Sequence, residues 1–311
     1  MVTITFRAMG CQMSAFLDVP SAQAAEALSD IPAWFEDWEQ ILSRFRTDSE
    51  LNQLNRSPAE SVQVSQVLWD VIQLALEAAD QSAGLVTPLV LGALEDAGYD
   101  RSFDLLAALS FDERVDDAQI GRPVPGFEGM VLDPFERTVC LPPGMRLDLG
   151  GVAKGWAANR AMEYLQEAGP ALVNAGGDIA ISGQRQDGRL WPVGILDPQR
   201  PESNLGTLLL PQSGVATSGI DYRRWQYHDV WQHHIIDPRS GQPARTDVLS
   251  TTVIAPTVMA AETAAKIVLI SGSQVGMEWL SDHPSLAAMV TRQNGQVDYS
   301  DSYRQYQWRL S

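Results

Sequence analysis

The order of strand-like and helix-like segments constrains the fold of this chain more than any single motif does. Residues 1–10 and 11–19 alternate apolar and polar side chains enough to predict two strands. Two segments with helical periodicity follow, at residues 21–43 and 66–80. Beyond them, strands and helices occur without the regular alternation of a doubly wound nucleotide fold, so we predict an α+β protein.

Each of the two predicted helices has an apolar stripe that we expect to face the core. The stripes are Trp34, Trp38 and Ile41 in the first helix, and Leu68, Val71, Ile72, Ala75 and Ala79 in the second. Near the C-terminus, residues 287–300 predict a hairpin that turns at Asn294 and Gly295.

Length and charge limit the class of protein. A chain of 311 residues can form one elaborated domain over residues 1–311, or two lobes separated near the Pro- and Gly-rich loop at 121–129. The 22 basic and 39 acidic residues give a net charge of -17, which argues against a nucleic-acid partner. Any anionic ligand must therefore be held by local groups.

The sequence contains no apolar run long enough for a membrane span, and its N-terminus does not resemble a signal peptide. We therefore expect a cytoplasmic protein. The alternative is an exported protein whose leader is missing from this sequence.

A glycine pair at 150 and 151 separates a strand-like segment, residues 146–149, from a helix that we expect to start near Val152. Backbone N–H groups at a helix start favour an anion such as a phosphate, and Lys154 would add a cation. Asp148 could accept a hydrogen bond from a sugar or a ring. The alternative is an ordinary strand-to-helix turn.

A second glycine pair, Gly176 and Gly177, interrupts a β-rich run. Adjacent glycines inside a strand pattern indicate a bulge or the close approach of another backbone or a ligand. Asn174 and Asp178 flank the pair with polar groups. A tight turn between two strands explains the glycines equally well.

Three of the four histidines, His228, His233 and His234, fall within residues 215–243. A zinc site would need further ligands, and adjacent histidines in a strand point to opposite faces. One histidine at a site and one structural histidine is the simpler interpretation.

Glu262 and Lys266 lie four positions apart in a run of apolar and small residues. In a helix this order favours a side-chain ion pair. A solvated salt bridge is the simplest explanation for both residues, unless the rest of the chain gives them a partner.

Taken in order, five blocks of the sequence resemble the successive motifs of the ApbE flavin transferases, the FAD:protein FMN transferase family. The blocks are LSRFRTDSELNQLN at 42–55, LDLGGVAKGWAANRA at 147–161, LVNAGGDIAISG at 172–183, VATSG at 215–219 and HHIIDPRSGQP at 233–243. The AMG at residues 8–10 is similar to the opening motif of that family.

The resemblance implies a T-fold-like α+β protein with mixed or antiparallel sheets and packed helices. Members of the family bind FAD and transfer its FMN half to a Thr or Ser of a redox flavoprotein, releasing AMP. Their acceptors carry a short Ser/Thr-Gly-Ala-Ser/Thr-like motif, which we do not find in this chain.

The same resemblance implies roles for individual residues. It places Met9, Asp148, Lys154 and Ile236 at FAD and His234 near the pyrophosphate. Because an imidazole can take a proton near neutral pH, we hypothesise that His234 is the general base for the acceptor hydroxyl. The remaining residues implied at the cofactor site are Phe45, Leu85, Val86, Thr87, Asn174, Gly176, Gly177 and Asp178.

Two departures from the family pattern stand out. Many members bind Mg²⁺ with an Asp and, four residues later, a Thr, where this chain has Glu262 and Lys266. An ammonium group cannot ligate a metal, so we hypothesise that Lys266, oriented by Glu262, takes the place of the ion. Exchanging Lys266 for Thr should then create magnesium dependence.

The second departure is at Val86, Thr87 and Leu89, which follow Leu85, where family members often have Phe-Asp-Pro-Thr after an Ala or Leu. This difference predicts weaker binding of FAD. Two further readings therefore compete with the transferase. One is an FAD-binding protein that no longer transfers FMN, and the other is a pyrophosphatase that splits FAD into FMN and AMP.

Overall fold

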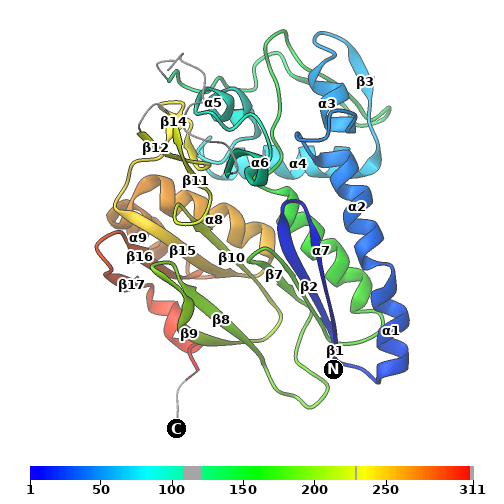
Figure 1. Ribbon diagram of the computed structural model, residues 1–311, viewed down its shortest axis with the longest axis vertical. Coiled ribbons are helices and arrows are strands. Elements are labelled where there is room, and N and C mark those ends of the chain that lie inside the picture. Colours follow the sequence, from blue (N-terminus) through cyan, green and yellow to red (C-terminus); the bar gives the residue numbers. More distant parts are fainter. Residues whose placement is uncertain (108–120, 228–229, 309–311) are drawn as a thin grey trace. The chain divides into compact units, whose positions relative to one another are not determined.

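The structure is a computed structural model that describes residues 1–107, 121–227 and 230–308 (Figure 1). The chain forms two compact units, each assembled from separated stretches. Unit 1 comprises residues 1–34, 154–222 and 245–311, and unit 2 comprises residues 35–153 and 223–244. The loop at 121–129 lies within unit 2.

Unit 1 is built on an eight-stranded sheet in which every neighbouring pair is antiparallel. In spatial order the strands are β1 (Val2–Ala8), β2 (Cys11–Leu17), β6 (Ala171–Ala175), β7 (Asp178–Ile181), β10 (Ser213–Gly219), β15 (Val248–Ala255), β16 (Ala287–Arg292) and β17 (Val297–Tyr299). The α+β class predicted from the sequence is confirmed.

The two faces of this sheet have different partners because successive side chains of a strand point in opposite directions. Ile179 and Val215 face the hairpin of β8 (Trp191–Asp197) and β9 (Arg200–Leu210), whose apolar side chains complete a buried core. Tyr303, from the short helix η3 (Asp301–Gln305), joins the same core. Asp178 lies one position from Ile179 and therefore faces the other side.

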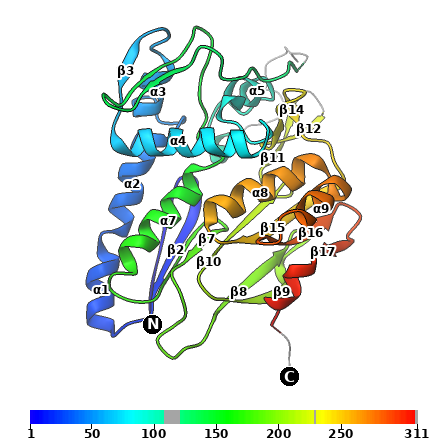
Figure 2. The same ribbon diagram turned by 180° about the vertical axis from the view of Figure 1, so that it is seen from behind.

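That other side is covered by helices α7 (Ala153–Leu165) and α8 (Val258–Ser271), which lie in front of the strands in Figure 2. The start of α8 lies directly against β10, since a Cβ on Gly214 would come within 2.0 Å of the Val258 nitrogen. Helix α8 is capped by the Thr257 hydroxyl, which accepts from the Ala260 N–H, and it ends at Gly272. Most of its side chains are buried, including Glu262.

The remaining elements of unit 1 are α1 (Ser21–Ser29) and α9 (Ser273–Ser281), and α2 (Ile31–Leu42) runs across the boundary into unit 2. Unit 2 contains α3 (Glu50–Asn55), β3 (Ser61–Gln63), α4 (Gln66–Gln81), η1 (Pro88–Val90), α5 (Leu91–Asp96), α6 (Phe103–Ala107), β4 (Val131–Asp133), β5 (Thr138–Cys140), β11 (Arg224–Tyr227), β12 (Val230–His233), β13 (Ile236–Asp237) and β14 (Gln242–Pro243). Strands β3, β5 and β4 form a small sheet, and the last four strands form two hairpins.

Several predictions from periodicity are confirmed. The first two strands, the helix at 66–80 with its buried stripe, and the hairpin at Asn294 and Gly295 are all present. The glycine pair at 176 and 177 forms the tight turn between β6 and β7, with positive φ at both residues.

Two predictions were wrong. The helix expected at 21–43 is interrupted at Asp30, and the buried face of its second half is Ile31, Phe35 and Leu42, whereas Trp34, Trp38 and Ile41 are only half-buried. Residues 146–149 form no strand.

No helix among the described residues is both long and apolar enough to cross a membrane.

Candidate functional site

Two tight turns of unit 1 lie at the same end of its sheet. One joins β1 to β2 through Met9 and Gly10, and the other joins β6 to β7 through Gly176 and Gly177. The turns are neighbours because β2 pairs with β6, and the Gly176 N–H donates to the Gln12 carbonyl at 3.2 Å. Several residues predicted at the cofactor site are therefore gathered at this end.

Met9 occupies a strained backbone conformation, with φ of 49°. A two-residue hairpin turn of this kind needs positive φ at both positions, which bulky side chains adopt at a cost. Glycine would satisfy the turn without strain. A methionine retained at such a position is typical of a side chain that serves a site.

The turn at Gly176 is tightly packed. A Cβ on Gly176 would lie 2.7 Å from the Cys11 Cβ and 2.8 Å from its sulfur, so only glycine fits beside the first hairpin. Asn174 closes the turn by accepting the Gly177 N–H at 2.8 Å. The tight turn is therefore present, and its backbone also approaches that of the first hairpin through the Gly176–Gln12 hydrogen bond.

Four charged side chains meet beside these turns, and we call them the lysine cluster: Lys154, Asp178, Glu262 and Lys266. Lys154 is the second residue of α7, Asp178 is the first of β7, and the other two lie on α8. The Glu262 Oε1 atom is 3.0 Å from the Lys266 Nζ and 3.5 Å from the Lys154 Nζ. Lys154 also forms a short ion pair with Asp178.

The lysine cluster is largely removed from solvent. The carboxylate side chains of Asp178 and Glu262 are 4% and 2% exposed, and the lysine side chains are 18% and 14% exposed. The interpretation of Glu262 and Lys266 as a solvated surface pair is therefore wrong.

Burial and neighbouring charge shift the proton affinities of the cluster. Burial and the nearby Glu262 carboxylate raise the pKa of Asp178 to about 6. The ammonium groups of Lys154 and Lys266 lower this pKa, but by less. Burial alone would lower the pKa of Lys154. The carboxylates of Asp178 and Glu262 outweigh it, so the pKa of Lys154 is raised and the group stays charged.

The cluster does not fit a magnesium ion. Its donor set is two carboxylates already matched by two ammonium groups, and the described residues contain no group of three or more His, Cys, Asp or Glu side chains placed to hold a metal. A divalent ion 4 Å from one ammonium would be repelled by roughly 8 kcal/mol at an effective dielectric constant of about 20. Mg²⁺ also requires an octahedron of oxygen ligands.

The second oxygen of Glu262 offers no alternative position for an ion. Glu262 Oε2 is buried and has no hydrogen-bond partner among the described residues. It lies against the backbone of α7, since a Cβ on Gly155 would be only 2.5 Å away. Gly155 therefore provides the space that lets this carboxylate reach both lysines.

Unit 2 brings together a second group of predicted residues around Arg44. The Arg44 guanidinium forms an ion pair of 2.6 Å with Asp148 and stacks 4.2 Å from the Phe45 ring centroid. It also lies 4.6 Å from the Tyr99 ring, which contacts Trp225 at 4.9 Å between centroids. Phe45 is 39% exposed, so this aromatic group reaches the surface of unit 2.

The two described histidines of the 233–243 block differ in their surroundings. In His233, Nδ1 accepts the Ile235 N–H, and Nε2 lies 2.9 Å from the Ala244 carbonyl, to which it donates in the matching tautomer. His233 is thus the structural histidine, and half-buried His234 follows it at the end of β12. His228 lies outside the described residues. Ile236 is buried in the same core as Tyr99 and Trp225.

Leu85, Val86 and Thr87 form the approach to η1 in unit 2. The Val86 N–H donates to the Ser82 hydroxyl at 2.9 Å, and the Thr87 hydroxyl accepts the Leu89 N–H at 3.3 Å. The next residue, Pro88, accepts the Asp148 N–H at 2.8 Å. This backbone bond connects the segment to Asp148.

Sequence reasoning missed Arg44, Tyr99 and Trp225. Arg44 precedes Phe45 within a block that carried the resemblance, and an arginine beside an exposed aromatic residue is a usable signal for stacking. Tyr99 and Trp225 come from distant segments and had no such signal.

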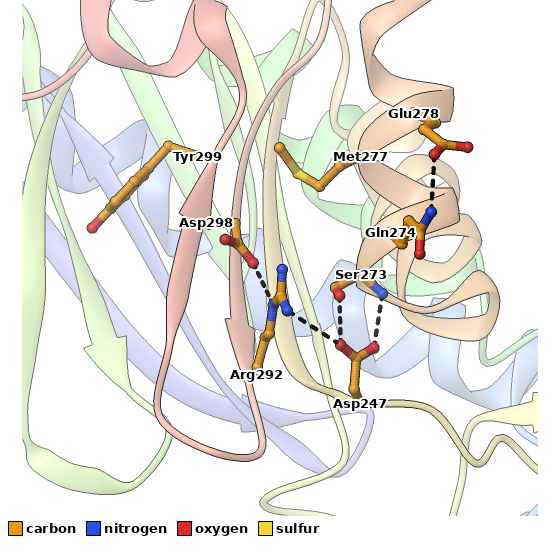
Figure 3. Close-up of a pocket in the computed structure, with 8 residues that line it drawn as sticks. All are labelled: Asp247, Ser273, Gln274, Met277, Glu278, Arg292, Asp298 and Tyr299. Atoms are coloured by element: carbon orange, nitrogen blue, oxygen red, sulfur yellow. Dashed lines mark hydrogen bonds and ion pairs between the residues drawn. The ribbon is translucent and has the colours of Figure 1, made fainter.

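Unit 1 also has a pocket of about 540 Å³, shown in Figure 3. It is lined by Asp247, Ser273, Gln274, Met277, Glu278, Arg292, Asp298 and Tyr299. Asp247 accepts from Ser273, and Arg292 pairs with Asp298. None of the residues predicted at the cofactor site lines this pocket, and its one cation is matched by carboxylates.

Comparison with known proteins identifies the family of this chain. The model of the ApbE family matches residues 3–290. The FAD:protein FMN transferase of Treponema pallidum is 30% identical over 297 residues, covering 90% of this chain and 80% of the relative. That of Vibrio cholerae is 28% identical, covering 88% and 82%.

Solved structures show the same fold. The crystal structure of the ApbE protein from Thermotoga maritima superposes with a TM-score of 0.81 at 25% identity, covering 99% of both chains. The flavin transferase ApbE from Vibrio cholerae gives 0.77 at 22% identity, over 98% of each chain. The fold and the sequence together define a flavin transferase scaffold. The chain belongs to the ApbE family.

Proposed function

We propose that this protein is an FAD:protein FMN transferase, which moves the FMN half of FAD to a Thr or Ser hydroxyl of a redox flavoprotein and releases AMP. The observation that carries the proposal is the lysine cluster beside the Met9 and Gly176 turns. There, residues from four separate stretches of unit 1 gather at one end of the sheet. Curated relatives with this activity support it.

The reaction is a phosphoryl transfer. A new bond forms between the acceptor oxygen and the FMN phosphorus, and the bond from that phosphorus to the bridging oxygen of the diphosphate breaks. The AMP phosphate leaves with the electron pair, and the proton of the hydroxyl passes to a base. Positioning and charge stabilisation supply most of the catalysis in such reactions.

We assign roles to the predicted residues of each unit separately. In unit 1, Met9, Asn174, Gly176, Gly177 and Asp178 shape the FAD site, and Lys154 and Lys266 supply positive charge. In unit 2, Phe45, Leu85, Val86, Thr87, Asp148 and Ile236 contact FAD. Arg44 pairs with Asp148 and supports the Phe45 ring.

His234 is the proposed general base. An imidazole titrates near neutrality and can take the proton of the acceptor hydroxyl, which typically contributes about 10² to 10⁴ in rate. We expect His234→Ala to lower the transfer rate by that factor and to leave the dissociation constant of FAD within about threefold. The matched control is His283→Gln, because His283 stacks on Trp279 in unit 1. Unchanged transfer by the His234 variant would remove this role.

The direct test incubates the protein with FAD and a peptide that carries a Ser/Thr-Gly-Ala-Ser/Thr motif. Peptide mass and AMP release are measured together. We expect the mass of FMN on the peptide and one AMP for each peptide modified. Free FMN with AMP would indicate the pyrophosphatase, and bound FAD without either product would indicate the carrier. The cytoplasmic location is still a prediction, and cell fractionation would test it.

A further inference from the structure

The lysine cluster contains every lysine of the chain. Lys154 and Lys266 are the only two among 311 residues, and the other 20 of the 22 basic side chains are arginines. Lysines normally cover protein surfaces. Here each lysine side chain is less than one-fifth exposed, and both contact the same Glu262 oxygen. Both lysines of the sequence therefore lie in one largely buried cluster.

An ammonium group differs from a guanidinium in a way that matters there. It is a compact point charge with three rotatable N–H donors, whereas the guanidinium is a broad planar fork. Of the two groups, the lysine ammonium is the more similar to a metal ion in size and charge density. Arginine is the side-chain cation at many other ion pairs of the described residues, including that of Arg44 with Asp148.

Both ammonium groups retain capacity for a further acceptor. Lys266 Nζ donates to Glu262 Oε1 at 3.0 Å and to the Glu262 carbonyl at 3.5 Å. Lys154 Nζ donates to Asp178 and, at 3.5 Å, to Glu262 Oε1. Each group thus uses two of its three donors within the cluster, which leaves one donor for a further acceptor.

We propose that Lys154 and Lys266 form a metal-free site for a diphosphate group, in which Lys266 replaces the divalent cation that its position beside Glu262 would otherwise hold. The inference rests on the proposed function, since FAD supplies the diphosphate. Glu262 holds both ammonium groups in place, and Gly155 gives its carboxylate the necessary space.

The presence of only two lysines makes the test unusually direct. Protein labelled with ¹³C at the lysine side chains gives two Cε signals, one for each residue of the cluster. FAD and ADP are each titrated into this protein in a buffer that contains a chelator, while both lysine signals are recorded. The flavin fluorescence is recorded as well in the titration with FAD. Riboflavin and adenosine, which lack a phosphate, are the ligand controls.

We expect FAD and ADP to shift both lysine signals in the chelator, and riboflavin and adenosine to leave them in place. Adding MgCl₂ after removal of the chelator should change the dissociation constant of FAD by less than about threefold. FAD that binds only with Mg²⁺, or that binds without moving either signal, would overturn the inference and leave the transferase intact. Absence of FAD binding under both conditions would overturn both proposals.

Variants sharpen the result. Lys266→Gln should weaken FAD binding in the chelator by roughly 10- to 100-fold, as expected for loss of a hydrogen bond from a charged donor. Lys266→Thr should show the same loss in the chelator and recover affinity with MgCl₂. The control is Arg160→Gln, which removes a cation from the exposed face of α7, where Arg160 pairs with Glu163. If a Lys266 variant fails to fold, the signals of the unsubstituted protein decide the question alone.

Discussion

Asp178 is a carboxyl group that folding makes harder to ionise. Burial and the neighbouring Glu262 raise its pKa from 3.8 to about 6. Between these values the folded protein binds more protons at this site than the unfolded chain does. The contribution of Asp178 to the free energy of unfolding is therefore complete below about pH 4 and is lost as the pH rises through about 6.

We predict that Asp178→Asn removes this dependence. The quantity to follow is the free energy of unfolding of the unsubstituted protein minus that of the variant. As the pH rises from 4 to 6.5, this difference should fall by up to about 3 kcal/mol. Urea unfolding at a series of pH values measures the difference.

Asp247 gives the opposite sign as a control. Burial opposes its ionisation, but hydrogen bonds from Ser273 outweigh this and lower its pKa. Its contribution is present above the unfolded pKa and is lost on acidification, so Asp247→Asn should differ most from the parent at neutral pH. Parallel pH profiles for the two variants would contradict the assignment of Asp178.

Part of the candidate site could be predicted from the sequence, residue by residue. Glu262 and Lys266 are four positions apart on one helix, so their contact follows from helix geometry. Lys154 is 108 positions from Glu262 and 24 from Asp178, and no local pattern connects such residues. Only the pairing of strands and the packing of α7 and α8 bring them together, which is why a surface ion pair was the simplest expectation.

At the scale of elements, the segment at 146–149 shows why alternating apolar and polar residues wrongly predicted a strand. The backbone N–H and carbonyl of Leu147 are satisfied by a side chain instead of a neighbouring strand. Asn55 donates to the Leu147 carbonyl at 2.9 Å and accepts the Leu147 N–H at 2.8 Å. The alternation of RLDL is that of an extended segment, and periodicity does not reveal which group supplies its hydrogen bonds.

Asn55→Ala should therefore be costly. It leaves a buried N–H and a buried carbonyl of Leu147 without partners, and we expect a loss of about 2 to 4 kcal/mol in the free energy of unfolding. The matched control is Asn159→Ala, since the Asn159 side chain bonds, among the residues that the structure describes, only Glu163 one turn along α7. Chemical denaturation of both variants checks the prediction, and equal stabilities would show that Asn55 does not hold this segment.

The break between α1 and α2 has a different cause. Pro32 has no backbone N–H, so one continuous helix would lose a bond there. The chain instead starts α2 at Ile31, and the Trp34 N–H donates to the Asp30 carbonyl at 3.1 Å. The interruption shifts the buried face from the tryptophans to Ile31 and Phe35. The proline was visible in the sequence, but its effect on the stripe depends on where the new helix begins.

At the scale of the whole molecule, the net charge of -17 opposes the approach of an anion such as FAD. The Debye length falls from about 30 Å at 0.01 M salt to about 8 Å at 0.15 M, so salt should screen this repulsion. We predict that the association rate constant of FAD rises about twofold or more over this range, whereas that of uncharged riboflavin does not change. Stopped-flow fluorescence measures both, and a rate constant for FAD that falls with salt would contradict the prediction.

The strand order of unit 1 also has a consequence for the newly made chain. The hairpin of β1 and β2 leaves the ribosome before the other strands of the sheet, but β6, its neighbour in the sheet, begins only at Ala171, and β15, an interior strand, begins at Val248. Such long-range pairing forms slowly, because distant segments must meet before any contact stabilises them. During synthesis the β1–β2 hairpin therefore keeps an unpaired strand edge until β6 has been translated, and the sheet stays incomplete until β15 and β16 follow. We expect a chaperone to be needed most during this interval.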